Sequence, residues 1–196
     1  MVFVLTVDQR KSRTAADLVE AAMTALNRDP GRPLRLAFDR TAGDEMQAAT
    51  ESAATAVGIG LELAASGHWS VGIGVGGVRE PLPSNTRAAA GEAFERARAA
   101  VTAAKTAPGN IAVSGASPLA GQAEAVLQLV AAVTRKRSKL SAEAGLLISE
   151  GLTQQEAASR LGISQQAVSS RLHSGLWHEC RRAAEVGVVL LEGADA

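Results

Sequence analysis

Hydrophobic and polar positions at the start of the chain follow the period of a strand and then that of a helix. Residues 2–7 (VFVLTV) are apolar and β-branched, which predicts a buried strand that ends at Asp8. Residues 12–28 change to helical spacing after a Ser or Thr cap, and the DPGRP cluster at 29–33 ends this helix. Four residues are expected on its apolar face: Leu18, Ala22, Ala25 and Leu26.

Strand and helix patterns continue to alternate up to residue 115. LRLAF and EMQAAT flank a Gly-Asp turn, which is typical of a β-hairpin. The glycines inside HWSVGIGVGGV indicate a strand that another backbone approaches closely. The elements predicted after the first helix are two strands at 34–38 and 45–50, a helix at 51–66, a strand at 68–78, a helix at 86–105 and a strand at 110–115.

This order, β-α-β-β-α-β-α-β, predicts an α+β fold with a ferredoxin-like core and one added element. From Leu119 onward only helical signals remain, with helices expected over 123–134 and 138–150. We therefore expect two domains, a ferredoxin-like domain over residues 1–117 and an all-α domain over residues 118–196.

The all-α domain contains the spacing of a helix-turn-helix over about residues 153–173, within TQQEAASRLGISQQAVSSRL. A capped first helix, a glycine turn and a capped second helix follow one another in this stretch. The pattern assigns the helix caps to Thr153 and Ser164, the helix contact to Ala157, the turn to Gly162, and buried apolar positions to Leu161, Ile163, Val168 and Leu172.

The second of these helices presents polar side chains away from its apolar positions. Glutamine pairs with adenine, serine bonds bases or phosphates, and arginine pairs with guanine or phosphate, so the helix suits the DNA major groove. We expect Gln165, Gln166 and Ser169 on bases and Arg171 nearer phosphate; a purely structural three-helix module is the alternative. The side chains expected to contact DNA are Thr153, Gln154, Ser164, Gln165, Gln166, Ser169, Ser170 and Arg171, with Arg135, Lys136, Arg137 and Lys139 of the basic stretch RKRSK.

An excess of positive charge, which favours nucleic-acid binding, occurs only in the stretch that contains the helix-turn-helix. The chain as a whole carries 20 basic and 20 acidic side chains, so its net charge indicates neither a nucleic-acid nor a membrane partner. Residues 135–182 carry eight basic and four acidic side chains, whereas residues 1–134 carry 12 and 13. Because neutralised phosphates provide most of the sequence-independent affinity for DNA, this basic excess favours DNA binding.

The rest of the composition indicates a cytoplasmic protein that is nucleoid-associated when bound to DNA. Cys180 is the only cysteine, which excludes a disulfide framework and a thiolate metal cluster. No apolar run reaches the roughly 18 residues of a membrane span, and residues 1–10 lack the order of a signal peptide.

Two acids lie at the ends of strands that we expect to be neighbours, Asp8 after the first strand and Asp44 at the hairpin tip. Paired carboxylates suit Mg²⁺, whose remaining octahedral positions are filled by waters and phosphate oxygens. A backbone role is the alternative, because Asp and Gly favour turns. If an arginine lies across the acids instead of a metal, the available residues are Arg10, Arg40 and Arg98.

The segments VLTVDQRKSR, TAGDEMQA, VGIGVGGV and GEAFERARAA, with the C-terminal helix-turn-helix, together resemble the SatD family of DNA-binding proteins over nearly the whole chain. The N-terminal part of that family is similar to the catalytic cores of class III nucleotide cyclases and GGDEF diguanylate cyclases. The resemblance implies a nucleotide cyclase-like fold with metal-binding acids at Asp8 and Asp44. It also implies a phosphate contact for Arg98.

Several residues depart from the cyclase pattern. Ala42, Gly43 and Met46 stand where a GGDEF enzyme has two glycines and a phenylalanine. Neither Arg96 nor Arg98 has, four residues earlier, the asparagine of class III cyclases. Because losing a group that stabilises the transition state costs orders of magnitude in rate, the resemblance implies a pocket that binds without turnover.

These features predict a sequence-specific DNA-binding protein, a transcriptional regulator whose degenerate cyclase-like domain dimerises or binds a nucleotide effector. One alternative is a Mg²⁺-dependent nucleotide-processing enzyme tethered to DNA, so enzymatic activity is left open. Another is an architectural protein whose N-terminal domain only oligomerises. We expect a homodimer, since two-fold partners gain affinity from paired half-sites, and a helix over 183–191 (AAEVGVVLL) that packs on the core or on a partner.

Overall fold

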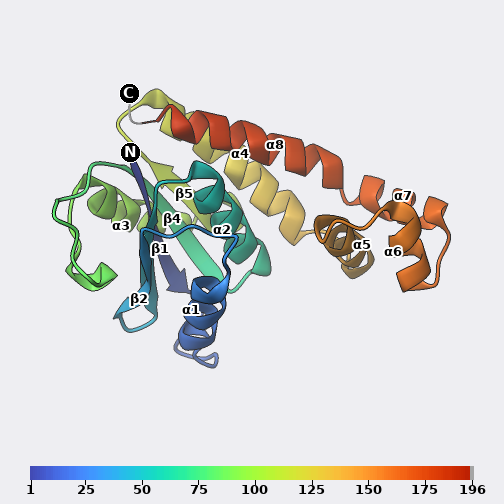
Figure 1. The fold of residues 1–196 in the computed structure, drawn as a ribbon, viewed down its shortest axis with the longest axis horizontal. Helices are drawn as coiled ribbons and strands as arrows, with labels where there is room; N and C mark the ends of the chain where they lie inside the picture. The colour runs from blue at the N-terminus through green and yellow to red at the C-terminus, as the bar shows by residue number, and fades with distance from the viewer. Residues whose placement is uncertain (195–196) are drawn as a thin grey trace.

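Five strands form one mixed sheet, and helices cover both of its faces (Figure 1). The computed structural model describes residues 1–194; Asp195 and Ala196, the end of the predicted helical domain, lie outside the described residues. The sheet order is β2-β3-β1-β4-β5, with antiparallel neighbours except for the parallel pair β4–β5. The strands are β1 (Val2–Gln9), β2 (Leu36–Ala42), β3 (Glu45–Thr50), β4 (Trp69–Gly76) and β5 (Ile111–Ser114).

The helices alternate with the strands in the first half of the chain and then follow one another. They are α1 (Val19–Arg28), α2 (Ala53–Ser66), α3 (Glu92–Ala104), α4 (Pro118–Arg135), α5 (Lys139–Ser149), α6 (Gln154–Leu161), α7 (Gln165–Ser174) and α8 (Trp177–Glu192), with short 3-10 helices η1 (Thr86–Ala88) and η2 (Pro108–Asn110). The predicted order of elements is confirmed, and so is the fold class. An α+β domain with a ferredoxin-like arrangement of its first four strands precedes a helical region.

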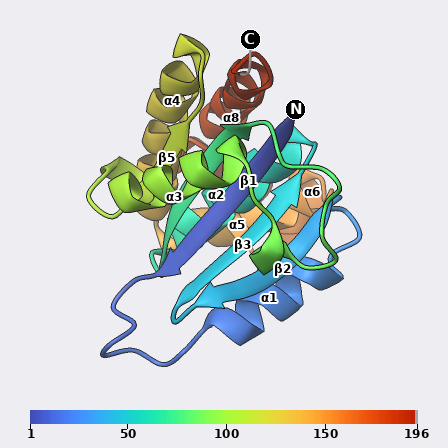
Figure 2. The ribbon, with the colours of Figure 1, turned by 90° about the vertical axis from the view of Figure 1, so that its left-hand side faces the viewer.

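The sheet separates two hydrophobic cores, because successive side chains of a strand point to opposite faces. Phe3, Leu5 and Val7 of β1 lie in the core under α1 and α2, whereas Val2 and Val4 lie in the core under α3. Figure 2 shows α3 on one face of the sheet and α1 on the other.

The interior glycines of β4 let α3 approach the sheet closely, as the sequence indicated. A Cβ atom added at Gly72 would lie 2.2 Å from the backbone nitrogen of Val101. One added at Gly74 would lie 2.1 Å from the carbonyl oxygen of Ala93. Real Cβ atoms do not approach other atoms so closely, so any larger residue at these positions displaces the helix.

The first helix is shorter than predicted. It begins at Val19 rather than near Ser12, and its N-cap residue makes no side-chain capping hydrogen bond. Gln9 explains the difference, because its buried side chain donates to the carbonyl of Ala16 (2.7 Å) and accepts from the backbone N–H of Leu18 (2.8 Å). This side chain holds residues 10–18 as a loop. Ala25, predicted on the apolar face, is exposed.

The helix predicted over residues 86–105 also begins later, at Glu92. The preceding residues form η1, where the buried Thr86 hydroxyl donates to the carbonyl of Ala37 in β2 (2.5 Å). That bond ties the segment to the edge of the sheet. Gly91, with φ of 140°, then turns the chain into α3.

Helices α4 and α8 run side by side along the sheet domain (Figure 1). Ala123 and Leu127 of α4 and Leu191 of α8 are buried in the same core as β1 and α2. A Cβ atom added at Gly187 would lie 2.7 Å from the Leu127 side chain, so the two helices are in close contact. Parts of α4 and α8 therefore pack in the core of the sheet, and the predicted domain boundary at residue 117 stays a prediction.

Helices α5, α6 and α7 form a separate unit beyond the ends of α4 and α8 (Figure 1). In residues 1–194, none of the helices has the length and apolar character needed to cross a membrane.

Candidate nucleic-acid interface

Two short helices, α6 and α7, are joined by a glycine turn in the order predicted for a helix-turn-helix. Thr153 Oγ1 accepts a hydrogen bond from the N–H of Glu156 (3.2 Å), whose carboxylate accepts one from the N–H of Thr153 (2.7 Å). Gly162 adopts a left-handed φ of 65°, and Ser164 Oγ accepts from the N–H of Ala167 (3.1 Å). The predicted caps and turn are confirmed.

The capping box favours the ionised form of the Glu156 carboxylate. The backbone and hydroxyl hydrogen bonds from Thr153 hold the pKa of Glu156 below its ordinary value. Negative charge at this place is also favoured by the positive end of the α6 dipole.

A small hydrophobic core holds α5, α6 and α7 together. Its fully buried members are Ala144, Leu147, Ala157, Ala158, Val168 and Leu172. Ala157, Val168 and Leu172 were predicted to be buried, and this is confirmed. Leu161 and Ile163 were predicted to be buried but are only partly so, because they flank the turn at the edge of this core.

The outward face of α7 carries the polar side chains expected there. Gln165, Gln166, Ser169 and Ser170 are all exposed, whereas Val168 and Leu172 are buried. His173 is exposed as well, seven residues after Gln166 and four after Ser169, so it shares their face. His173 was not predicted from the sequence, although its helical spacing from Gln166 is visible there.

Of the other side chains in this unit that were predicted to contact DNA, some are exposed to solvent and one, Arg171, lies beside another side chain of the protein. Thr153 and Ser164 are exposed at the starts of α6 and α7, and Gln154 is partly exposed. The side chain of Arg171 is 23 % exposed, and its Nη1 lies 3.8 Å from the carboxylate of Glu143. Arg171 therefore lies beside α5 and not in the row of glutamines and serines.

The basic stretch RKRSK mostly joins the two parts of the molecule. Arg135 donates a hydrogen bond to Oδ1 of Asn110, in the sheet domain. Arg137 donates through Nε to the carbonyl of Gly175 (2.7 Å), and its guanidinium lies 5.1 Å from the centre of the Trp177 ring. Two lysines of the stretch are exposed: Lys136 and Lys139.

A second polar site lies at the end of β1. Asp8 and Asp44 line one pocket of about 700 Å³, so the structure brings the two predicted acids together. The Lys105 ammonium lies 2.9 Å from Asp8 Oδ2. Within residues 1–194, no three His, Cys, Asp or Glu side chains come close enough to hold a metal ion.

The three arginines that were predicted as possible partners of Asp8 and Asp44 bind other groups or lie outside the pocket. Arg10 lines the pocket but donates to Asn110 Oδ1 (2.7 Å). Arg40 pairs with Asp17 (2.6 Å), and this hydrogen bond holds the pKa of Asp17 below its ordinary value. Arg98 is exposed and does not line the pocket. Lys105 was missed because nothing in the local sequence links it to a residue 97 positions away.

Comparison with known protein families gave a match to the part of the chain that contains the helix-turn-helix. The family model for Sigma-70, region 4 matches residues 145–178, from inside α5 to the start of α8. The match supports a DNA-binding helix-turn-helix in this chain and leaves the sheet domain uncovered. Neither the curated proteins nor the solved structures gave a match. The resemblance to the SatD family stays a prediction.

Proposed function

We propose that this protein is a sequence-specific DNA-binding regulator of transcription. The observation that carries the proposal is the exposure of Gln165, Gln166 and Ser169 on α7, whose apolar residues Val168 and Leu172 are buried. These side chains lie inside the stretch that matches Sigma-70, region 4. Exposed amides and hydroxyls on a helix that projects from the protein suit base edges better than they suit a structural surface.

In this proposal α7 enters the major groove and α6 crosses the backbone. The exposed caps Thr153 and Ser164 then lie at helix N-termini, where N–H groups favour phosphate. Lys136 and Lys139, both exposed, are proposed to contact phosphates on the flank. Arg135 and Arg137 are proposed to position the unit rather than to bind DNA, because their guanidinium groups already have protein partners.

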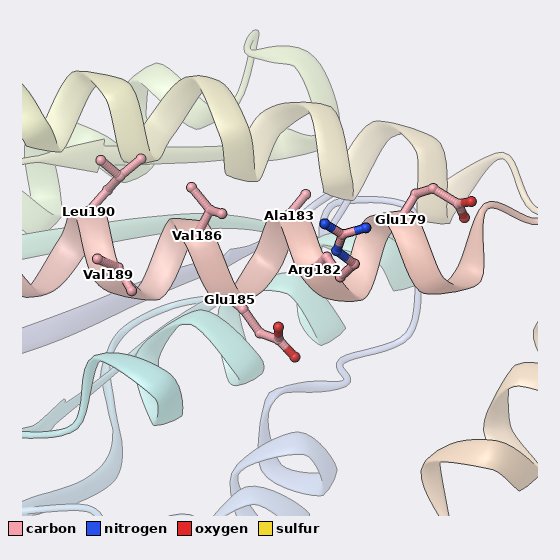
Figure 3. Close-up of a pocket in the computed structure, with 7 residues that line it drawn as sticks. All are labelled: Glu179, Arg182, Ala183, Glu185, Val186, Val189 and Leu190. Atoms are coloured by element: carbon pink, nitrogen blue, oxygen red, sulfur yellow. The ribbon is translucent and has the colours of Figure 1, made fainter.

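We also propose a homodimer formed through α8. The outward side of this helix carries Val186 and Val189, which are 52 % and 67 % exposed. Figure 3 shows both valines on α8, with Arg182 and Glu179 nearer the start of the same helix. The intervals of three and four residues between these positions are those of a helix that pairs with another helix.

Charge complementarity favours a second copy of this chain as the partner. If two α8 helices pair antiparallel so that Val186 faces the partner's Val189, Arg182 comes opposite the partner's Gly193, beside Glu192 of the partner subunit. An Arg–Glu pair then flanks the apolar centre at each end. Two-fold pairing also presents two α7 helices to half-sites separated by about one or more helical turns of DNA.

The role of the sheet domain as a degenerate cyclase-like domain is carried by the resemblance to the SatD family alone. A Mg²⁺-dependent enzyme is the weaker candidate, because the Lys105 ammonium already neutralises Asp8. An architectural protein would bind DNA without preference for particular bases, whereas a regulator prefers its own site. The selectivity of binding for DNA sequence therefore distinguishes the two roles.

Selection of bound duplexes from a random DNA library, with the purified full chain, tests the proposal. We expect one enriched sequence that binds at least about a thousandfold more tightly than random DNA at physiological salt. Binding of all duplexes with equal affinity would favour the architectural role, and absence of binding would overturn DNA recognition altogether.

A further inference from the structure

The loop between β1 and α1 forms one wall of the polar pocket at the end of β1, which we call the loop pocket. Its volume of about 700 Å³ lies in the range of small-molecule sites. Figure 2 shows this loop extending beyond the edge of the sheet. The lining residues are Asp8, Gln9, Arg10, Lys11, Ser12, Arg13, Thr14, Asp44, Ser70 and Lys105.

Positive charge exceeds negative charge in the loop pocket, with four basic and two acidic side chains among the lining residues. Lys105 pairs with Asp8, and Arg10 is held by the Asn110 side chain. Lys11 and Arg13 are exposed, and neither makes an ion pair within residues 1–194. Two cations therefore face the pocket with no internal partner, which favours an anionic ligand.

The loop is held in place before any ligand arrives. The buried Gln9 side chain bonds Ala16 and Leu18, at the far end of the loop. The N–H groups of Thr14 and Ala15 donate to the carbonyl of Lys11 (both 2.9 Å), which closes a turn at the centre. A ligand that binds a preorganised loop does not incur the entropy cost of ordering it.

Asp8, one of the two acids of the pocket, does not need a metal to offset its charge beside an anion. Asp8 would repel a phosphate, but the Lys105 ammonium at 2.9 Å offsets its charge where a divalent cation would otherwise do so. Lysine is a common phosphate ligand in proteins, acting as a point charge. The same ammonium can therefore neutralise Asp8 and attract an anion.

We propose that the loop pocket binds a small anion with two linked phosphate groups, held by Lys11, Arg13 and Lys105 without a divalent metal. Two linked phosphates match the two unpaired cations of the loop, and the pocket has room for a diphosphate. The proposal does not rest on DNA binding by α7, which lies in a separate unit of the structure.

Calorimetry with inorganic pyrophosphate in the presence of EDTA tests the site. We expect saturable binding by the full chain, weakened about tenfold or more in the double variant K11A/R13A, because each substitution removes a charge-assisted contact. Both side chains are exposed, so circular dichroism should show an unchanged fold.

The matched control is R28A/R79A, which removes two exposed positive charges outside the loop pocket. Binding by this control within twofold of the original chain supports a local site. Equal weakening in both double variants, absence of saturable binding, or binding that requires Mg²⁺ would each overturn the proposal. Loss of DNA affinity in K11A/R13A, without any pyrophosphate binding, would show that the loop contacts DNA phosphates instead.

Discussion

Arg10 and Arg135 donate hydrogen bonds to the same atom, Oδ1 of Asn110. Asn110 is 5 % exposed and lies between the end of α3 and β5. Arg10 belongs to the loop pocket, whereas Arg135 ends α4, directly before the helix-turn-helix unit. One buried amide therefore joins the polar pocket of the sheet domain to the connection that carries α5, α6 and α7.

Replacing Arg135 by Ala should loosen this connection without unfolding either part. We expect faster proteolysis between residues 135 and 139 and a loss of about 1 kcal/mol in unfolding free energy, because Arg135 is exposed and its bond is partly screened. Limited proteolysis with mass spectrometry measures the first effect. Arg182→Ala, an exposed arginine of α8, is the control, and equal cleavage rates in the two variants would show that the Asn110 bond does not fix the connection.

The close contact between β4 and α3 predicts a large loss of stability in Gly72→Ala. The new methyl group would overlap the α3 backbone, and overpacking of this kind costs about 1 to 3 kcal/mol or more. Gly58→Ala is the control, because an added Cβ there has no neighbour within 4 Å. In helix α2 that substitution should stabilise by about 0.5 to 1 kcal/mol. Thermal unfolding compares the two, and a shift of the same sign in both would contradict the packing argument.

The capping box of α6 predicts a pH-dependent helix-turn-helix. Thr153→Ala should cost about 1 kcal/mol of stability in this unit. The pKa of Glu156 is lowered in the folded chain, so its contribution is present above the unfolded pKa and is lost as pH falls through the folded value. The protection of α6 amides against hydrogen exchange, relative to the intrinsic exchange rate at each pH, should therefore fall in acid in the original chain and change less in Thr153→Ala. An identical acid response in both chains would rule out this role for the cap.

The proposed dimer predicts that charge on the outward side of α8 produces monomers. Val189→Asp places an acid at the centre of the paired helices, and Val189 is already 67 % exposed, so the fold should be kept. Leu146→Asp on α5 is the control, since Leu146 is 58 % exposed and is not part of the outward side of α8. Sedimentation should report a monomer for the first variant and a dimer for the second. A monomer for the unaltered chain would remove the dimer from the account.

Local patterns predicted most of the fold because the deciding interactions lie close together in the chain. The caps Thr153 and Ser164 and the turn at Gly162 are recognisable within a few residues. The late start of α1 was missed because Gln9 holds the loop from within the preceding strand. The spacing of apolar residues does not reveal a side chain that hydrogen-bonds to the backbone in place of a helical turn.

The sites were predicted less completely because their parts come from distant segments. Asp8 and Asp44 line one pocket as expected, since the β1–β3 register pairs Asp8 with Glu45, the residue next to Asp44. Lys105 reaches the same pocket from the end of α3, and only the folded chain shows it. The hydrogen bonds of Arg135 and Arg137 were not predicted for the same reason. Their acceptors lie far away in the sequence, and a short basic run without known partners is expected to be exposed to solvent.

Base preference of the α7 helix is the most direct test of the account. Affinity should be measured for every single base-pair variant of the selected DNA site, with the original chain, Gln165→Ala and Gln166→Ala. Gln122→Ala, an exposed glutamine on α4, is the control. We expect each α7 variant to lose about 1 to 3 kcal/mol of discrimination at one base position, with the control unchanged. Unaltered preference in both α7 variants would contradict major-groove reading by this helix.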